Sequence, residues 1–199
     1  MAALRLGLFA DSHYSDREIS CRTRRPSLSY RKIGEAMRAF AAAGADAAVI
    51  LGDLVDACRD RSSDRAELFV VSKVAAENKS YETAARSIDE TLEKMGLDYL
   101  DMMIIHSPQP WAEWRGENRY FAENREVWRA LEDACGAGKL RAIGVSNFLE
   151  DDLDSLLPHC KIKPAVDQVL AHIGNTPKTL IAYCADRRIA VEAYSPISN

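Results

Sequence analysis

Short runs of Val, Ile and Leu alternate with amphipathic stretches along most of the chain, and this alternation limits the possible folds more than any other feature. Strands that are apolar throughout and separated by helices are typical of parallel βαβ units buried on both faces. Because crossover connections are right-handed, the carboxyl ends of all the strands are expected at one edge, where functional sites gather. The sequence therefore predicts an α/β fold with its site at that edge.

The apolar runs predict about seven strands. They lie at 4–10, 47–51, 68–74, 99–105, 142–145, 165–170 and 189–194. Helices are predicted at 28–43, 81–95, 124–137, 149–157 and 177–187. A closed (β/α)₈ barrel usually takes ~250 residues, and this chain has 199. We therefore expect an incomplete, TIM-barrel-like parallel fold of about seven βα units without the eighth strand.

Composition excludes several other classes of protein. The 30 acidic and 26 basic residues give a formal charge of −4, which predicts binding neither to nucleic acid nor to an anionic membrane surface. No apolar run approaches the roughly 18 residues of a membrane span, and the apolar start is predicted to be a strand, not a signal peptide. The five cysteines are scattered and lack a CxxC pair, so reduced thiols in a cytoplasmic protein are expected.

Acidic and imidazole side chains follow the first two predicted strands. Asp11 and His13 come directly after the first strand, and Asp53 follows the second. Hard oxygen ligands with one imidazole suit Mn, Fe or Zn. The alternative is that these aspartates only cap loops and helix starts.

This opening resembles the calcineurin-like metallophosphoesterases over about residues 4–60. The resemblance implies that Asp11 and His13 hold a first metal and that Asp53 bridges to a second. The later Asn-His and His-x-His motifs of that family have no match in this sequence. Two metal ions are needed to clamp both the attacking and the leaving oxygen, so half of the ligand set predicts weak metal binding and little hydrolysis.

A different group of polar residues follows the later strands. Lys73 ends the third strand and His106 follows the fourth, where a lysine can tune a neighbouring acid and a histidine can polarise a carbonyl oxygen. Ser146, Asn147 and Gln168 lie at the next strand ends, and amides and a hydroxyl there can hold a carboxamide. Tyr194, after the last strand, can stack on a flat ring. These are the requirements of a nicotinamide site.

This part of the chain resembles the aldo-keto reductase family over about residues 67–197. The motifs that carry the resemblance are Ser-Lys, Ile-His-Ser-Pro, Ile-Gly-Val-Ser-Asn-Phe and Glu-Ala-Tyr-Ser-Pro, in that order. The resemblance implies a (β/α)₈ barrel, NADPH as cofactor and a small-molecule carbonyl substrate. It makes Lys73 and His106 two of four catalytic residues and Ser146, Asn147 and Gln168 contacts of the nicotinamide carboxamide. It also makes Tyr194 the stacking ring and Ser195 the start of the pyrophosphate loop.

The sequence also departs from the family pattern. The family's catalytic Asp and proton-donating Tyr follow its second strand, and residues 52–66 contain no tyrosine. Asp167 stands where the family usually has Asn, and the sequence stops before the eighth strand and the loop for the adenosine 2′-phosphate. The aromatic residues that follow His106 either wall a substrate pocket or pack the loop on the barrel rim. They are Trp111, Trp114, Tyr120 and Phe121.

Together the two resemblances predict a chimera, with a phosphoesterase-like segment at 1–62 and a reductase-like segment at 63–199 packed as one domain. Three functions stay open: an NADPH-dependent reductase of weak or no activity, a metal-dependent phosphoesterase, and a folded chimera without catalysis. The missing strand leaves an open sheet edge, which predicts an open barrel, a homodimer that closes it, or poor stability.

Overall fold

The computed structural model describes the backbone of residues 6–10, 14–15, 47–51 and 55–57, and residues 69–172 and 174–195 with their side chains. The chain divides into two compact units, Met1–Val70 and Val71–Asn199. The division into segments at 1–62 and 63–199 stays a prediction. The predicted helix at 28–43 and the predicted metal ligands Asp11, His13 and Asp53 lie outside the described residues.

The first unit contains two small parallel strand pairs. Strand β1 (Leu6–Ala10) pairs with β3 (Ala47–Leu51), and β2 (Tyr14–Ser15) pairs with β4 (Val55–Ala57). The strands β1 and β3 confirm the predicted runs at 4–10 and 47–51. The other two were not predicted, because segments of two or three residues are too short to show a periodic pattern.

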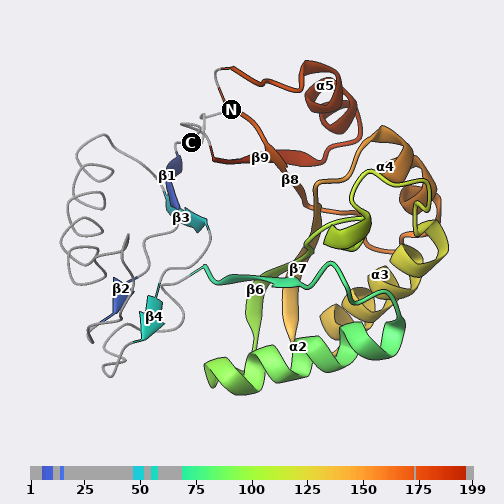
Figure 1. Cartoon of the computed structure of the whole chain (residues 1–199). Helices are drawn as coiled ribbons and strands as arrows, with labels where there is room; N and C mark the ends of the chain where they lie inside the picture. Colours follow the sequence, from blue (N-terminus) through green and yellow to red (C-terminus); the bar gives the residue numbers. More distant parts are fainter. Residues whose placement is uncertain are drawn as a thin grey trace. The chain divides into compact units, whose positions relative to one another are not determined.

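A parallel five-stranded sheet forms the second unit (Figure 1). Its order follows the sequence: β5 (Val71–Val74), β6 (Leu100–Ile105), β7 (Leu140–Ser146), β8 (Val166–Leu170) and β9 (Ala190–Tyr194). The sheet is not closed, and helices alternate with its strands, so the prediction of an incomplete α/β barrel is confirmed. The last five predicted strands build this sheet, whereas the first two pair with each other in the first unit.

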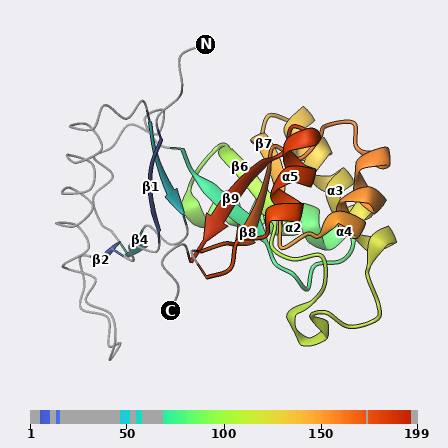
Figure 2. The same cartoon turned by 90° about the horizontal axis from the view of Figure 1, so that it is seen from above.

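The helices form an arc along one face of the sheet (Figures 1 and 2). They are α2 (Tyr81–Met95), α3 (Phe121–Gly136), α4 (Glu150–Leu156) and α5 (Lys178–Asp186), with single 3₁₀ turns η2 (Trp111–Glu113) and η3 (Leu157–His159). Ile88 of α2 and Leu131 of α3 are buried together with Ile104 of β6. None of the helices in the described ranges is long and apolar enough to cross a membrane.

Helix α2 has the bounds that the sequence predicts, because both of its ends carry strong local signals. Ser80 and Thr83 form a reciprocal capping box at its start, and Gly96 ends it with a left-handed φ of 62°. Helix α3 begins at Phe121, earlier than the predicted residue 124, after Tyr120 with a φ of 52°. Among the described residues, no side-chain cap marks the start of α3, so the sequence places this start too late.

Candidate cofactor site

The carboxyl ends of β5 and β6 bring Lys73 and His106 to the same edge of the sheet. Lys73 is paired in register with Ile104, and the backbone N–H of His106 donates to the carbonyl of Val74 at 3.0 Å. Burial lowers the pKa of the half-buried His106, and the positive charge of Lys73 lowers it further, while Glu77 partly opposes both. The imidazole is therefore neutral at neutral pH and can donate a hydrogen bond from one nitrogen.

The side chain of Asn147 connects three strand ends. Its Nδ2 donates to the carbonyl oxygen of His106 at 3.0 Å and to Oγ of Ser146 at 3.0 Å. Its Oδ1 accepts from the hydroxyl of Tyr194 at 2.8 Å. Asn147 has a φ of 62°, a conformation that asparagine tolerates better than most residues. The ends of β6, β7 and β9 are thus held by one amide.

Gln168 lies at the centre of this edge and leaves one polar atom unused. The hydroxyl of Ser146 and the backbone N–H of Asn147 both donate to its carbonyl oxygen, at 2.7 and 3.0 Å. Its Nε2 donates to Oε1 of Glu192 at 2.7 Å. Its Oε1 is buried and has no hydrogen-bond partner among the residues that the structure describes. A buried acceptor of this kind needs a donor, and the NH₂ of a carboxamide supplies one.

Tyr194 is hydrogen-bonded to this group, and Ser195 is its exposed neighbour in the chain. Burial raises the pKa of Tyr194, with Arg115 acting in the opposite direction, so its hydroxyl stays protonated and remains the donor to Asn147. Ser195 follows directly, is exposed and has a φ of 49°. The structure brings Ser146, Asn147, Gln168, Tyr194 and His106 into one hydrogen-bonded group, and Ser195 lies at its border.

The aromatic residues after His106 divide into two groups. Trp111 packs edge-on against the His106 ring with the centroids 5.0 Å apart and the planes at 86°, and Trp114 lies 5.5 Å from Trp111. Tyr120 and Phe121 instead form the start of α3. Trp111 is 42% exposed, so part of an aromatic side chain that contacts His106 is accessible from outside. Of the two alternatives for this cluster, loop packing describes the α3 end, and a pocket wall at the Trp111 end stays a prediction.

The model of the Aldo/keto reductase family matches residues 43–199. The chain belongs to this family. It is 44% identical to glyoxal reductase of Bacillus subtilis over 133 residues, which are 67% of this chain and 44% of that protein. It is 39% identical to morphine 6-dehydrogenase of Pseudomonas putida over 141 residues, 71% of this chain and 45% of that protein.

Solved structures of aldo/keto reductases show the same arrangement. The enzyme of Brucella melitensis superposes with a TM-score of 0.63 at 30% identity, over 69% of this chain and 50% of that one. The Bombyx mori enzyme, solved in complex with NADP, gives a TM-score of 0.58 at 29% identity, over 84% of this chain and 48% of that one. The chain thus spans about half the length of the relatives that it matches.

The family match corrects one boundary of the sequence analysis. We expected the aldo-keto reductase resemblance to begin near residue 67, but the match begins at residue 43 and includes Asp53. The residues from 43 to 60 therefore give no support to a phosphoesterase segment. The described part of the chain also holds no group of three or more His, Cys, Asp or Glu side chains that could bind a metal ion.

Two features near the site were not found from the sequence. Asp167 on β8 is fully buried, and no side chain within the described residues donates a hydrogen bond to its carboxylate oxygens. Burial raises the pKa of Asp167 to about 8, with a smaller opposing effect of the Phe148 backbone amide. The second feature is a buried network around Lys79 and Gln109. Neither residue lies in a motif, and their partners are distant in sequence, so no local pattern signals them.

Proposed function

We propose that this edge of the sheet binds the nicotinamide of NADPH and that the protein is an oxidoreductase acting on a small carbonyl compound. The observation that carries the proposal is the buried, unpartnered Oε1 of Gln168, a residue whose backbone carbonyl also accepts from the backbone N–H of Asn147. A relative of the chain is known in complex with NADP, which supports the choice of cofactor.

Each residue of the site would contact a different part of the cofactor or hold a neighbouring residue in place. Oε1 of Gln168 accepts a hydrogen bond from the carboxamide, and the ring of Tyr194 stacks on the nicotinamide. Asn147 mainly holds the neighbouring site residues in place, because its Nδ2 already donates hydrogen bonds to His106 and Ser146. Ser195, at the border of the site, is the proposed first contact of the pyrophosphate.

When bound, NADPH supplies the hydride that reduces a carbonyl carbon. The chain's own contribution lies with His106 and Lys73. The neutral imidazole of His106 donates a hydrogen bond to the carbonyl oxygen, which gains negative charge in the transition state. The ammonium of Lys73 stabilises that charge and keeps His106 neutral. The open ring face of Trp111 places apolar surface where a substrate would lie.

We further propose that cofactor binding is better preserved than turnover. Residues 52–66 hold no tyrosine to match the proton donor of the family. Loss of a positioned general acid costs ~10²–10⁴ in rate. Glyoxal is a suitable test substrate, because a relative of the chain is named for its reduction. No observation on the described residues favours phosphoester hydrolysis, and we do not propose it.

The proposal is tested by titrating the protein with NADPH and following its fluorescence. We expect saturable binding that weakens about tenfold in Gln168→Leu, since one hydrogen bond and a buried contact are lost. Lys73→Ala is expected to bind NADPH well but to lose glyoxal reduction. Tyr183→Phe, a change on the outer helix α5, is the matched control and should leave both unchanged. Absence of saturation at millimolar NADPH in the unmodified protein would refute the proposed cofactor.

A further inference from the structure

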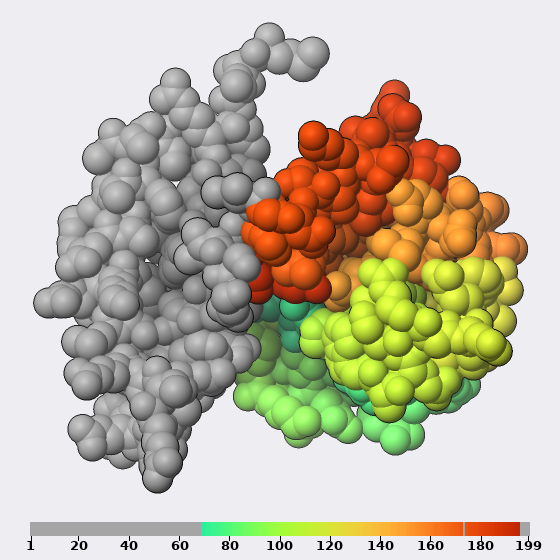
Figure 3. All heavy atoms as spheres, turned by 45° about the horizontal axis from the view of Figure 1, so that its top comes forward, coloured from blue at the N-terminus to red at the C-terminus, as the bar shows by residue number. Residues whose placement is uncertain are grey.

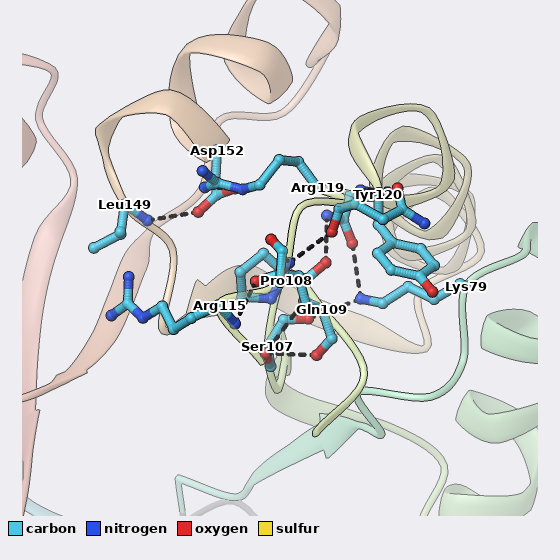
Figure 4. Close-up of polar contacts among 12 residues, drawn as sticks. Lys79, Ser107, Pro108, Gln109, Arg115, Arg119, Tyr120, Leu149 and Asp152 are labelled. Atoms are coloured by element: carbon cyan, nitrogen blue, oxygen red, sulfur yellow. Dashed lines mark hydrogen bonds and ion pairs between the residues drawn. The ribbon is translucent and has the colours of Figure 1, made fainter. Parts of the chain in front are cut away.

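The segment 107–120, between β6 and α3, forms one wall of the proposed site through the contact of Trp111 with His106. It contains only the single 3₁₀ turn η2, so regular backbone pairing does not account for its shape. In the space-filling view this yellow-green segment is a dense mass on the surface (Figure 3). Side chains of α3 and α4, of Lys79 just before α2, and of the segment itself replace the missing backbone pairing (Figure 4).

Gln109 organises the segment from inside. Its side chain is buried, and its Nε2 donates to the carbonyl oxygens of Gly116 at 3.0 Å and Asn118 at 2.6 Å. Its Oε1 accepts from the backbone N–H of Arg115 at 3.0 Å. The amide of Gln109 therefore satisfies three backbone groups that have no strand or helix to bind them.

Lys79, directly before the cap of α2, holds the start of the segment. Its Nζ donates to the carbonyl oxygen of Ser107 at 2.8 Å and to Oδ1 of Asn124 at 2.9 Å. Nδ2 of Asn124 in turn donates to the carbonyl oxygen of Pro108 at 2.9 Å. One lysine just before α2 and one asparagine on α3 thus fix the two residues that follow His106.

The other end of the segment is held by α4. Nη2 of Arg119 donates to Oδ1 of the buried Asp152 at 2.7 Å, and Oδ2 of Asp152 accepts from the backbone N–H of Leu149 at 3.0 Å. The segment is therefore tied to α2, α3 and α4 and also bound to itself. Because so many hydrogen bonds hold it, we expect the segment to keep this conformation without a ligand. A lid that closes over a ligand would have few such bonds.

We propose that Lys79 and Gln109 are positioning residues that keep Trp111 against His106 before any substrate arrives. Neither residue is needed to touch the substrate or the cofactor. The claim that the segment walls a carbonyl substrate rests on the proposed function. The contact of Trp111 with His106 does not, because it is present in the protein without a ligand. The two can therefore be tested separately.

The first test follows the titration of His106 by NMR, with its signal assigned from its loss in His106→Gln. Among the described residues, the charges that shift the pKa of His106 are those of Lys73 and Glu77, so we expect no direct effect from removing the charge of Lys79. In Lys79→Met we expect the pKa of His106 to rise by about half a pH unit, because water reaches the ring when the wall loosens. Lys79→Arg should restore most of the original value.

Lys94→Met is the matched control for that test. Lys94 lies in the last turn of α2, its side chain is 75% exposed, and it pairs only with Glu90 among the described residues. The titration of His106 should be the same in this variant as in the unmodified protein. An unchanged His106 titration in a folded Lys79→Met protein would overturn the role of Lys79.

The second test follows hydrogen exchange of the backbone amide of Arg115. Gln109→Leu removes all three side-chain bonds, so exchange at Arg115 should become about tenfold faster. Gln109→Glu keeps an acceptor for Arg115 but loses the donors to Gly116 and Asn118, so protection at Arg115 should be largely retained. Equal exchange in Gln109→Leu and the unmodified protein, with both showing a cooperative thermal transition, would overturn the role of Gln109.

A third measurement separates this inference from the proposed function. With NADPH and 4-nitrobenzaldehyde as probes, Lys79→Met should raise KM about fivefold and leave kcat within about twofold, since a displaced wall weakens binding more than chemistry. An unchanged KM would contradict a wall for the substrate. If the unmodified protein does not bind NADPH, the proposed function alone is refuted, because the two tests on the free protein use neither cofactor nor substrate.

Discussion

Asp167 is the residue whose environment is most at odds with its chemistry. It is the second residue of β8 and is fully buried, and no side chain in the described part of the chain donates a hydrogen bond to its carboxylate. An ionised carboxylate is costly in such a place, and burial raises the pKa of Asp167 to about 8. The folded protein therefore carries Asp167 as a neutral acid at neutral pH, whereas the unfolded chain ionises it near pH 4.

This difference predicts how stability depends on pH. Between about pH 4 and pH 8 the folded state binds one more proton at Asp167 than the unfolded state, so stability falls as pH rises, by up to ~1.4 kcal/mol per pH unit. Asp167→Asn should remove this slope and stabilise the protein at pH 7. Urea unfolding at several pH values between 5 and 8 measures how the free energy of unfolding depends on pH. The exposed Asp151→Asn serves as the control, and an equal slope in Asp167→Asn and the unmodified protein would contradict the neutral form of Asp167.

Tyr194 allows its ring and its hydroxyl to be tested apart. Tyr194→Phe keeps the aromatic face and loses the hydrogen bond to Oδ1 of Asn147. We expect NADPH to bind about fivefold more weakly, which corresponds to the net value of about one hydrogen bond. Tyr194→Ala should weaken binding further because stacking is also lost. Equal affinities of the two variants for NADPH, measured by fluorescence titration, would argue against stacking on this ring.

At the scale of elements, the closeness of β7 and β8 depends on one glycine. A Cβ added to Gly144 would lie 2.6 Å from Cγ1 and 2.7 Å from the carbonyl oxygen of Val166, and 3.0 Å from Cγ2 of Ile104. The backbone oxygen cannot move away without disturbing the pairing of the strands. Gly144 is therefore required by the approach of neighbouring strands, directly before the residues that form the candidate site.

Gly144→Ala should destabilise the protein by about 2 kcal/mol, because the added methyl group forces β7 and β8 apart. Gly136→Ala is the matched control: a Cβ there meets nothing within 4 Å. It should change the free energy of unfolding by less than about 0.5 kcal/mol or be slightly stabilising, since alanine favours the helix. Thermal and urea unfolding of the two variants test this, and equal losses of stability would exclude a special role for the Gly144 contact.

The elements differ in how far the sequence could predict them. Helix α2 and the strands of the five-stranded sheet were predictable, because caps, stop signals and apolar runs are local features. The site residues at the strand ends were predictable as a group for the same reason, since parallel strands end at one edge. The network around Gln109 was not, because side-chain bonds to backbone groups several residues away leave no periodic trace. Burial of Asp167 without a side-chain partner also depends on tertiary packing alone.

For the whole molecule, the open sheet is the feature with the widest consequence. Within the described residues, β5 and β9 each pair with a strand on one side only. Unpaired strand edges bind other strands readily. These two strand edges are where a homodimer would form, and the homodimer stays a prediction.

This prediction is tested by measuring the mass in solution across protein concentrations. A dimer should give about twice the chain mass of 22.1 kDa at high protein concentration, and it should dissociate on dilution. Light scattering coupled to gel filtration, between about 1 and 100 µM, covers the range of typical weak dimers. A mass that stays at that of one chain throughout would refute the dimer.

The hydrogen bonds of Asn147 have a consequence for the order of events at the site. One end of its amide holds the residue proposed to meet the substrate, and the other holds the ring proposed to meet the cofactor. A ligand that draws the Tyr194 hydroxyl away from Asn147 alters the support of the His106 carbonyl. If cofactor binding changes the affinity for substrate through this amide, substrate binding must change the affinity for cofactor by the same factor. The proposed function therefore implies that the two occupants are thermodynamically linked through the side chain of Asn147.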